Sequence, residues 1–161
     1  MKAALFPGTF DPPTLGHLDL IQRAALLFER LYVAVGYNVH KPKTAFNLDE
    51  RLDLMNQVTA HLKQVKVVSF SGLLVDCAKE LGVSVLLRAV RGASEFECEA
   101  FQAYVNRELE GMETLYMAAS DKYRLISSSL VREVGSHGRR LHAFVPKEIE
   151  DAVARRLQRH G

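Results

Sequence analysis

The chain has 161 residues, and its 48% hydrophobic and 25% charged residues are the composition of one globular domain. No apolar run approaches the roughly 20 residues of a membrane-spanning helix, and the N-terminal run is too short for a signal peptide. We therefore expect a cytoplasmic protein, with Cys77 and Cys98 as reduced thiols. The formal net charge of +2 argues against a basic nucleic-acid-binding face and favours a small ligand.

Short apolar runs alternate with amphipathic stretches, which predicts strands alternating with helices. Lys2–Phe6 is predicted as a buried strand that stops at Pro7-Gly8. The next helix begins near His17, and its apolar positions are Leu18, Ile21, Ala24, Ala25 and Phe28. Leu31–Gly36 is predicted as the second strand.

A capping box marks the start of the second helix, because Glu50 follows Asn47 by three residues. The apolar positions of this helix are Leu48, Leu52, Met55 and Val58. Next come a strand at Val65–Phe70, a helix at Leu73–Leu81 that ends before Gly82, and a strand at Val83–Leu87. The last predicted elements are a helix capped by Ser94 and running to about Leu109, a strand at Thr114–Ala118, a helix at Ser127–Val134 and a helix opened by Pro146.

This alternation predicts a single α/β domain over residues 1–161, with a five-stranded, mostly parallel sheet and helices on both faces. In such folds the ligand lies beyond the carboxyl ends of the strands. The segments to search for functional residues are therefore those that follow the strands: 7–16, 37–46, 71–74, 88–95 and 119–129.

The loop after the first strand is the most informative. Gly8 would let the backbone approach a ligand, Thr9 supplies a hydroxyl, and Thr14-Leu-Gly-His17 enters a helix. A helix start has free N–H groups and a partial positive charge, and an imidazole there can donate to a phosphate oxygen. Taken alone, a histidine at a helix start is more often a cap or a surface residue than a functional one. The loop is neither a Walker A sequence nor a dinucleotide-binding fingerprint.

Three further loops carry phosphate-binding groups to the same predicted edge. Lys41 lies in the second loop, where the alternative is a basic surface loop. Arg88 and Arg91 follow the fourth strand, and arginine can grip phosphate with paired hydrogen bonds. Their alternative is an ion pair with one of the acidic residues nearby, which are Glu95, Glu97 and Glu99. Ser127–Ser129 offer hydroxyl and N–H donors at another helix start.

Two of these motifs together resemble the paired signature of the nucleotidylyltransferase superfamily: Thr14-Leu-Gly-His17, and Ile126-Ser-Ser-Ser129 with Arg132. A fuller set is similar to the bacterial phosphopantetheine adenylyltransferases: Phe6-Pro-Gly-Thr-Phe-Asp-Pro, Lys41, Arg88-x-x-Arg91 and Phe96-Glu-Cys-Glu99. The resemblance extends from Lys2 to the helix after Pro146.

The resemblance implies that ATP and 4′-phosphopantetheine react to dephospho-coenzyme A and pyrophosphate, the penultimate step of coenzyme A biosynthesis. It also implies a Rossmann-like fold, Mg²⁺ bound with the ATP, a homohexamer and feedback inhibition by coenzyme A. A phosphate monoester is already anionic at neutral pH, so a direct in-line attack without a general base is expected.

Residue roles carry over from the family to the matching positions. His17 matches the histidine that binds the ATP phosphates and stabilises the transition state, with Lys41 and Arg91 as further catalytic cations. The positions that match the phosphopantetheine site are Thr9, Lys41, Leu74 and Arg88. The positions that match the ATP site are Thr9, Phe10, His17, Ala89, Val90, Arg91, Glu99, Tyr123, Arg124, Leu125, Ile126, Ser127, Ser128 and Ser129.

Three positions depart from the family pattern, in which Ala89 is commonly Gly, Val39 is often Pro and Cys98 is commonly Tyr. The methyl group of Ala89 could crowd the nucleotide, and Val39 could leave its loop less rigid. None of the three changes removes a predicted phosphate ligand.

Three other functions stay open at this point. A nucleotidylyltransferase acting on nicotinate mononucleotide or a phosphorylated alcohol would carry the same two signatures. A non-catalytic nucleotide-binding domain is disfavoured by the presence of all the predicted cations. A nucleic-acid-binding role is the weakest, because basic and aromatic residues are not interleaved and tryptophan is absent.

Overall fold

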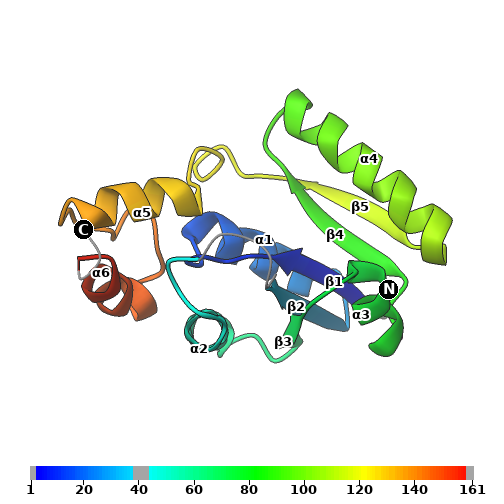
Figure 1. The fold of residues 1–161 in the computed structure, drawn as a ribbon, viewed down its shortest axis with the longest axis horizontal. Helices are drawn as coiled ribbons and strands as arrows, with labels where there is room; N and C mark the ends of the chain where they lie inside the picture. Colours follow the sequence, from blue (N-terminus) through cyan, green and yellow to red (C-terminus); the bar gives the residue numbers. More distant parts are fainter. Residues whose placement is uncertain (1–2, 38–43, 159–161) are drawn as a thin grey trace.

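The computed structural model describes residues 3–37 and 44–158 and contains the predicted alternation of strands and helices (Figure 1). The strands are β1 (Ala3–Gly8), β2 (Arg30–Gly36), β3 (Val65–Phe70), β4 (Val85–Val90) and β5 (Glu113–Ala118). The helices are α1 (Leu15–Ala25), α2 (Leu48–Thr59), α3 (Leu74–Glu80), α4 (Ala93–Glu110), α5 (Ser128–Ser136) and α6 (Glu150–Gln158), and the short 3-10 helix η1 (Lys147–Ile149) precedes α6.

All five strands are parallel and follow the order β3-β2-β1-β4-β5, which confirms the predicted α/β fold. The order reverses at β1, so the crevice between β1 and β4 is the expected ligand site. These two strands share a single registered pair, Leu5 with Leu86, whereas β1 pairs with β2 along its whole length. The sheet therefore opens between β1 and β4, as Figure 1 shows.

Alternate residues of the central strands enter two separate cores. Phe6 belongs to the core that contains Ile21 of α1 and Met55 of α2, and α5 and α6 extend this core at the end opposite α4. Leu5 belongs to the other core, with Val75 of α3. Helix α4 packs against β4 and β5 but has no fully buried residue. Helices thus cover both faces of the sheet, as predicted.

Several predicted helix ends are confirmed. Asn47 and Glu50 form the reciprocal capping box of α2. Gly82 follows α3 with a φ of 66°, a left-handed conformation that glycine adopts without strain. Pro146 precedes η1, and α6 continues from it.

Three local predictions were wrong. The first strand does not stop at Pro7-Gly8, because its ladder with β2 continues through both residues. Ser94 lies inside α4, whose N-cap is Gly92. The fourth strand begins later and ends later than predicted, because its ladder with β5 continues through Arg88 and Val90. Arg88 is therefore a strand residue whose position is set by the sheet, and only Arg91 lies beyond the strand.

Among the described helices, none is both long and apolar enough to cross a membrane. Both cysteines are free, with Cys77 half-buried and Cys98 exposed. Burial raises the pKa of the Cys77 thiol, so this group is neutral and a poor nucleophile at neutral pH.

Candidate active site

A cleft of about 630 Å³ lies along the carboxyl ends of the strands, where β1 and β4 separate. Its walls come from the loop after β1, the first turn of α1, the start of α3, one side of α4 and the segment after β5. The predicted site residues that line it are Thr9, Phe10, His17, Leu74, Arg88, Ala89, Arg91, Glu99, Tyr123 and Ile126.

Other predicted site residues are not part of this lining. Val90, Arg124, Leu125, Ser127, Ser128 and Ser129 lie outside it. Lys41, and with it Val39, falls outside the residues that the structure describes. The roles that the resemblance implies for these positions stay predictions.

His17 is the third residue of α1, and its ring faces the helix start. The backbone N–H of Thr14 donates to His17 Nδ1 at 3.1 Å, and the His17 N–H donates to the Thr14 hydroxyl at 3.3 Å. Because an N–H group can only donate, Nδ1 must be unprotonated in this arrangement. The proton of the neutral ring is then on Nε2, which lies on the far side of the ring and is available to a ligand in the cleft.

The imidazole of His17 is held in its neutral form. Burial, and then the positive charge of Arg91, lower its pKa from 6.5 to about 4. Phe10 contributes to the burial, since its ring meets the imidazole edge-on at 5.0 Å between centroids. A neutral imidazole that donates from Nε2 suits a phosphate oxygen and does not need to transfer a proton.

Gly8 lines the cleft, and it has a packing role besides the predicted one. A Cβ atom at this position would lie 2.6 Å from the tip of the Phe10 ring, so glycine is required for the packing of Phe10. Phe10 itself has a φ of 49°. The backbone of this loop is thus shaped to bring an aromatic ring beneath His17.

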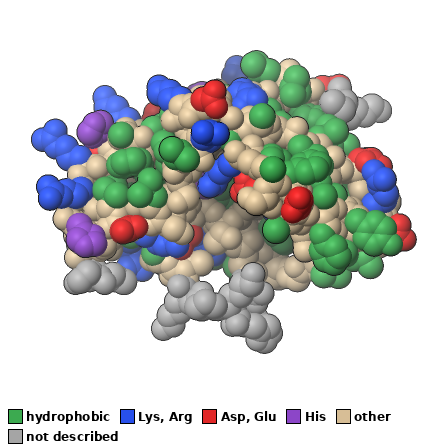
Figure 2. Space-filling model, turned by 90° about the horizontal axis from the view of Figure 1, so that it is seen from above, with side chains coloured by type: hydrophobic (Ala, Val, Ile, Leu, Met, Phe, Trp, Pro, Cys, Tyr) green, Lys and Arg blue, Asp and Glu red, His purple; other side chains and the backbone are tan. Residues whose placement is uncertain are grey.

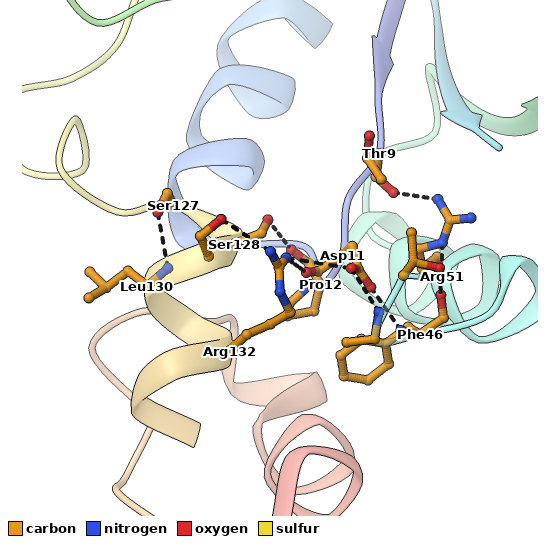
Figure 3. Close-up of polar contacts among 12 residues, drawn as sticks. Thr9, Asp11, Pro12, Phe46, Arg51, Ser127, Ser128, Leu130 and Arg132 are labelled. Carbon is orange, nitrogen blue, oxygen red and sulfur yellow. Dashed lines mark hydrogen bonds and ion pairs between the residues drawn. The ribbon is translucent and has the colours of Figure 1, made fainter. Parts of the chain in front are cut away.

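The two signature motifs are in direct contact. Ser128 donates from its hydroxyl to the carbonyl oxygen of Pro12 at 2.8 Å, and Arg132 donates to the carbonyl oxygen of Asp11 at 2.6 Å (Figure 3). Ser127 caps α5 by accepting from the N–H of Leu130. The side chains of the serine run therefore have structural partners, and the groups of this turn best suited to an anion are its backbone N–H groups.

Arg51 was missed by the sequence analysis. It is only 2% exposed, and its Nη1 donates to the carbonyl oxygens of Thr9 at 2.7 Å and Gly36 at 2.8 Å (Figure 3). Its Nε donates to the carbonyl oxygens of Phe46 and Asn47. One guanidinium therefore joins the loop after β1, the end of β2 and the start of α2. The sequence did contain a signal for this role: Arg51 lies four residues before Met55, on the apolar face of α2, where a charged residue needs buried partners.

The carboxylate of Asp11 makes the complementary set of contacts. It accepts from the N–H groups of Ala45 at 3.0 Å and Phe46 at 2.8 Å, and Arg132 also approaches it. Asp11 is buried, and its negative charge opposes the lowering of the Arg51 pKa that burial causes. Together Asp11 and Arg51 hold the first loop against the residues that follow the predicted Lys41 loop.

A second polar group positions the wall after β5. Ser120 donates to Asp19 of α1 at 2.7 Å, and Arg23 donates to the carbonyl oxygen of Ala118 at 2.9 Å. This anchors the segment that leads to Tyr123, which is predicted to belong to the ATP site. None of these three side chains was identified from sequence, because nothing in the local pattern joins α1 to a loop a hundred residues later.

Comparison with known proteins agrees with this geometry. Residues 5–134 match the cytidylyltransferase-like family. The chain belongs to this family. As a cytidylyltransferase-like protein it is a nucleotidyltransferase, and the cleft that opens between β1 and β4 is its candidate active site.

A solved structure has a similar fold. It is a protein from Vibrio parahaemolyticus assigned as a nicotinate-nucleotide adenylyltransferase, and it superposes with a TM-score of 0.71. The match covers 99% of this chain and 96% of that chain, at 16% sequence identity. At this identity the likeness establishes the Rossmann-like fold and leaves the acceptor to be argued from the site.

The first prediction concerns the protonation of His17. Because its pKa is about 4 in the fold, we expect ¹⁵N NMR at pH 7 to show an unprotonated Nδ1 and a protonated Nε2. The unfolded chain takes up this proton at higher pH, so this group lowers the free energy of unfolding as pH falls from 6.5 toward 4. A His17→Asn variant identifies the signal. A His17 resonance that titrates near pH 6.5 would contradict the neutral assignment.

The second prediction concerns Arg51. Arg51→Met keeps most of the side-chain volume but removes the guanidinium that donates to four carbonyl oxygens, so the free energy of unfolding should fall by about 3 kcal/mol. The oxygens of Phe46 and Asn47 keep other donors, the Thr44 hydroxyl and the backbone N–H of residue 51, so most of the loss should come from Thr9 and Gly36. Arg51→Lys should restore part of this loss. Urea denaturation measures both variants, with the exposed Arg30→Met as the matched control. Equal losses for the Arg51 and Arg30 variants would show that the buried guanidinium does not hold these segments together.

Proposed function

We propose that this chain transfers the adenylyl group of ATP to 4′-phosphopantetheine, with release of pyrophosphate and formation of dephospho-coenzyme A. The observation that supports this acceptor is the composition of the cleft. His17, Arg88 and Arg91 give it a cationic, hydrogen-bonding part. The same lining also includes apolar side chains, which are Phe70, Leu73, Leu74, Ala103, Val105 and Leu109, beside the polar Gln102 and Asn106. A phosphate on a long, flexible arm can use both the cations and the apolar side chains of this lining.

The proposed reaction is a direct displacement. An oxygen of the acceptor phosphate attacks the α-phosphorus of ATP, and the bond from this phosphorus to the oxygen that bridges to the β-phosphate breaks. The protein positions two anions and neutralises the charge between them. Nε2–H of His17 donates to a phosphate oxygen as negative charge moves to pyrophosphate, while Arg88 and Arg91 offset the charge of the reactants.

Magnesium is proposed to enter with the nucleotide. Across residues 3–37 and 44–158, no group of three His, Cys, Asp or Glu side chains could hold a metal ion. The acidic residues of the cleft are already bonded, Glu95 to the N–H of Arg91 and Glu99 to the side chain of Arg88. MgATP, with the metal held by phosphate oxygens and water, is therefore the proposed substrate.

A homohexamer is proposed from the family resemblance and from one surface. Phe101 and Tyr104 of α4 are 66% and 62% exposed, and Leu115 of β5 is 38% exposed. Hydrophobic side chains gather on the end of the molecule that carries α3 and α4 (Figure 2). Such a surface is typical of an interface, and light scattering will give the mass. A monomeric mass at micromolar concentration would exclude the hexamer.

The acceptor is tested with a panel. Purified protein is incubated with ATP or CTP and with 4′-phosphopantetheine, nicotinate mononucleotide or a phosphorylated alcohol, and pyrophosphate release is measured. We expect release with ATP and 4′-phosphopantetheine, and competition by coenzyme A, which shares the pantetheine arm. Release with another acceptor alone would replace the proposed substrate. Tight ATP binding without release from any acceptor would indicate a non-catalytic domain.

The third prediction concerns the catalytic role of His17. His17→Ala should lower kcat by about 10²- to 10³-fold, because its hydrogen bond strengthens in the transition state. KM for both substrates should change much less. His142→Ala, at an exposed histidine outside the cleft, is the control. A kcat close to that of the unmodified protein would remove His17 from catalysis.

The fourth prediction concerns Lys41, whose role rests on the resemblance. Lys41→Ala should weaken the binding of 4′-phosphopantetheine more than the binding of ATP, because its charge is assigned to the acceptor phosphate. Separate calorimetric titrations with the two ligands measure this, with the exposed Lys63→Ala as control. A larger loss for ATP would reassign Lys41 to the nucleotide.

A further inference from the structure

Arg88 is paired with the carboxylate of Glu99. Its Nε donates to Glu99 Oε2 at 2.5 Å and its Nη2 donates to Glu99 Oε1 at 2.6 Å, so the pair is bidentate. Both side chains are largely shielded from water, with 30% of Arg88 and 17% of Glu99 exposed. A pair in this geometry holds the plane of the guanidinium in one orientation.

The third contact of Arg88 places it at the opening of the sheet. Nη1 donates to the carbonyl oxygen of Pro7 at 3.4 Å, across the gap between β4 and β1. A guanidinium has five N–H groups, and these contacts use three of them. Among the described residues, one N–H on each terminal nitrogen is then left for a ligand. Two such groups on a planar fork match two oxygens of a phosphate.

The resemblance assigns Glu99 to the nucleotide, but its surroundings favour another role. Both carboxylate oxygens face Arg88, and a carboxylate that contacted the phosphates directly would repel them. Glu99 comes from α4, whereas Arg88 comes from β4, so the contact links the helix wall of the cleft to the sheet.

We propose that Glu99 is a positioning residue for Arg88, and that through this residue it sets the affinity for the acceptor phosphate. Glu99 holds the guanidinium by one edge, and one N–H on each terminal nitrogen is left to the acceptor. The phosphate then binds an arginine that is already ordered, and loses no affinity to fixing a flexible side chain. This inference rests on the proposed function, because it assumes that Arg88 binds the acceptor.

Glu99→Gln tests the proposal, because the amide keeps the size of the side chain but cannot accept at both positions. Calorimetry should show a Kd for 4′-phosphopantetheine that is raised about tenfold, and a Kd for ATP that changes by less than about twofold. Glu97→Gln is the matched control, since it removes an equal charge from an exposed position of the same helix. A Kd for ATP raised as much as that for the acceptor would overturn the proposal and return Glu99 to the nucleotide.

Two further measurements separate this proposal from the choice of acceptor. Without any substrate, the ¹⁵Nε–H resonance of Arg88 should be protected from exchange in the unmodified protein and lose that protection in Glu99→Gln but not in Glu97→Gln. Unchanged protection in Glu99→Gln would overturn the positioning role.

In an Arg88→Met background, Glu99→Gln should cause no further loss of acceptor binding, and an additive loss would overturn the positioning role as well. If 4′-phosphopantetheine does not bind the unmodified protein, the proposed acceptor fails separately, and the titrations are made with the acceptor that the panel identifies.

Discussion

The site depends on one buried cation. Arg51 donates to carbonyl oxygens from three segments that are remote in sequence, and the carboxylate of Asp11 accepts from backbone N–H groups of one of them. Loops after parallel strands have no ladder of their own, so their exposed backbone groups need other partners. Arg51 supplies these partners at the carboxyl edge. The loop that carries His17 is thereby held by side chains that never touch the ligand cleft.

Side chains of the two signature motifs also make structural contacts. The family resemblance assigns Ser128 to ATP, yet its hydroxyl donates to the carbonyl oxygen of Pro12, and Arg132 of the same signature donates to the carbonyl oxygen of Asp11. His17 likewise uses Nδ1 to cap its own helix and keeps Nε2 for the cleft. These structural contacts fix the orientation of the groups best suited to a ligand: Nε2–H of His17 and the backbone N–H groups of the turn at Ser127–Ser129.

Sequence patterns predicted the elements and the edge at which the site lies, because periodicity and strand order determine both. They placed Arg88 and Arg91 in the right region but put Arg88 beyond its strand, since the length of a ladder depends on the partner strand. The role of Arg51 depends on contacts across more than forty residues, and that of Asp19 on contacts across a hundred. Patterns within a few neighbouring residues cannot predict contacts over such distances in sequence. For Arg88 the sequence left two roles open, a phosphate ligand or a partner in an ion pair. The ion pair with Glu99 is present, and both residues of the pair line the cleft.

The single registered pair between β1 and β4 has a mechanical consequence. His17 is carried by the part of the fold built on β1, β2 and β3, whereas Arg88 and Glu99 are carried by the part built on β4, β5 and α4. The two parts are also joined by side chains: Arg88 donates to the carbonyl oxygen of Pro7, and Ser120 donates to Asp19 of α1. Hydrogen bonds at the cleft thus hold together two parts of the sheet that the strand ladder joins at a single registered pair.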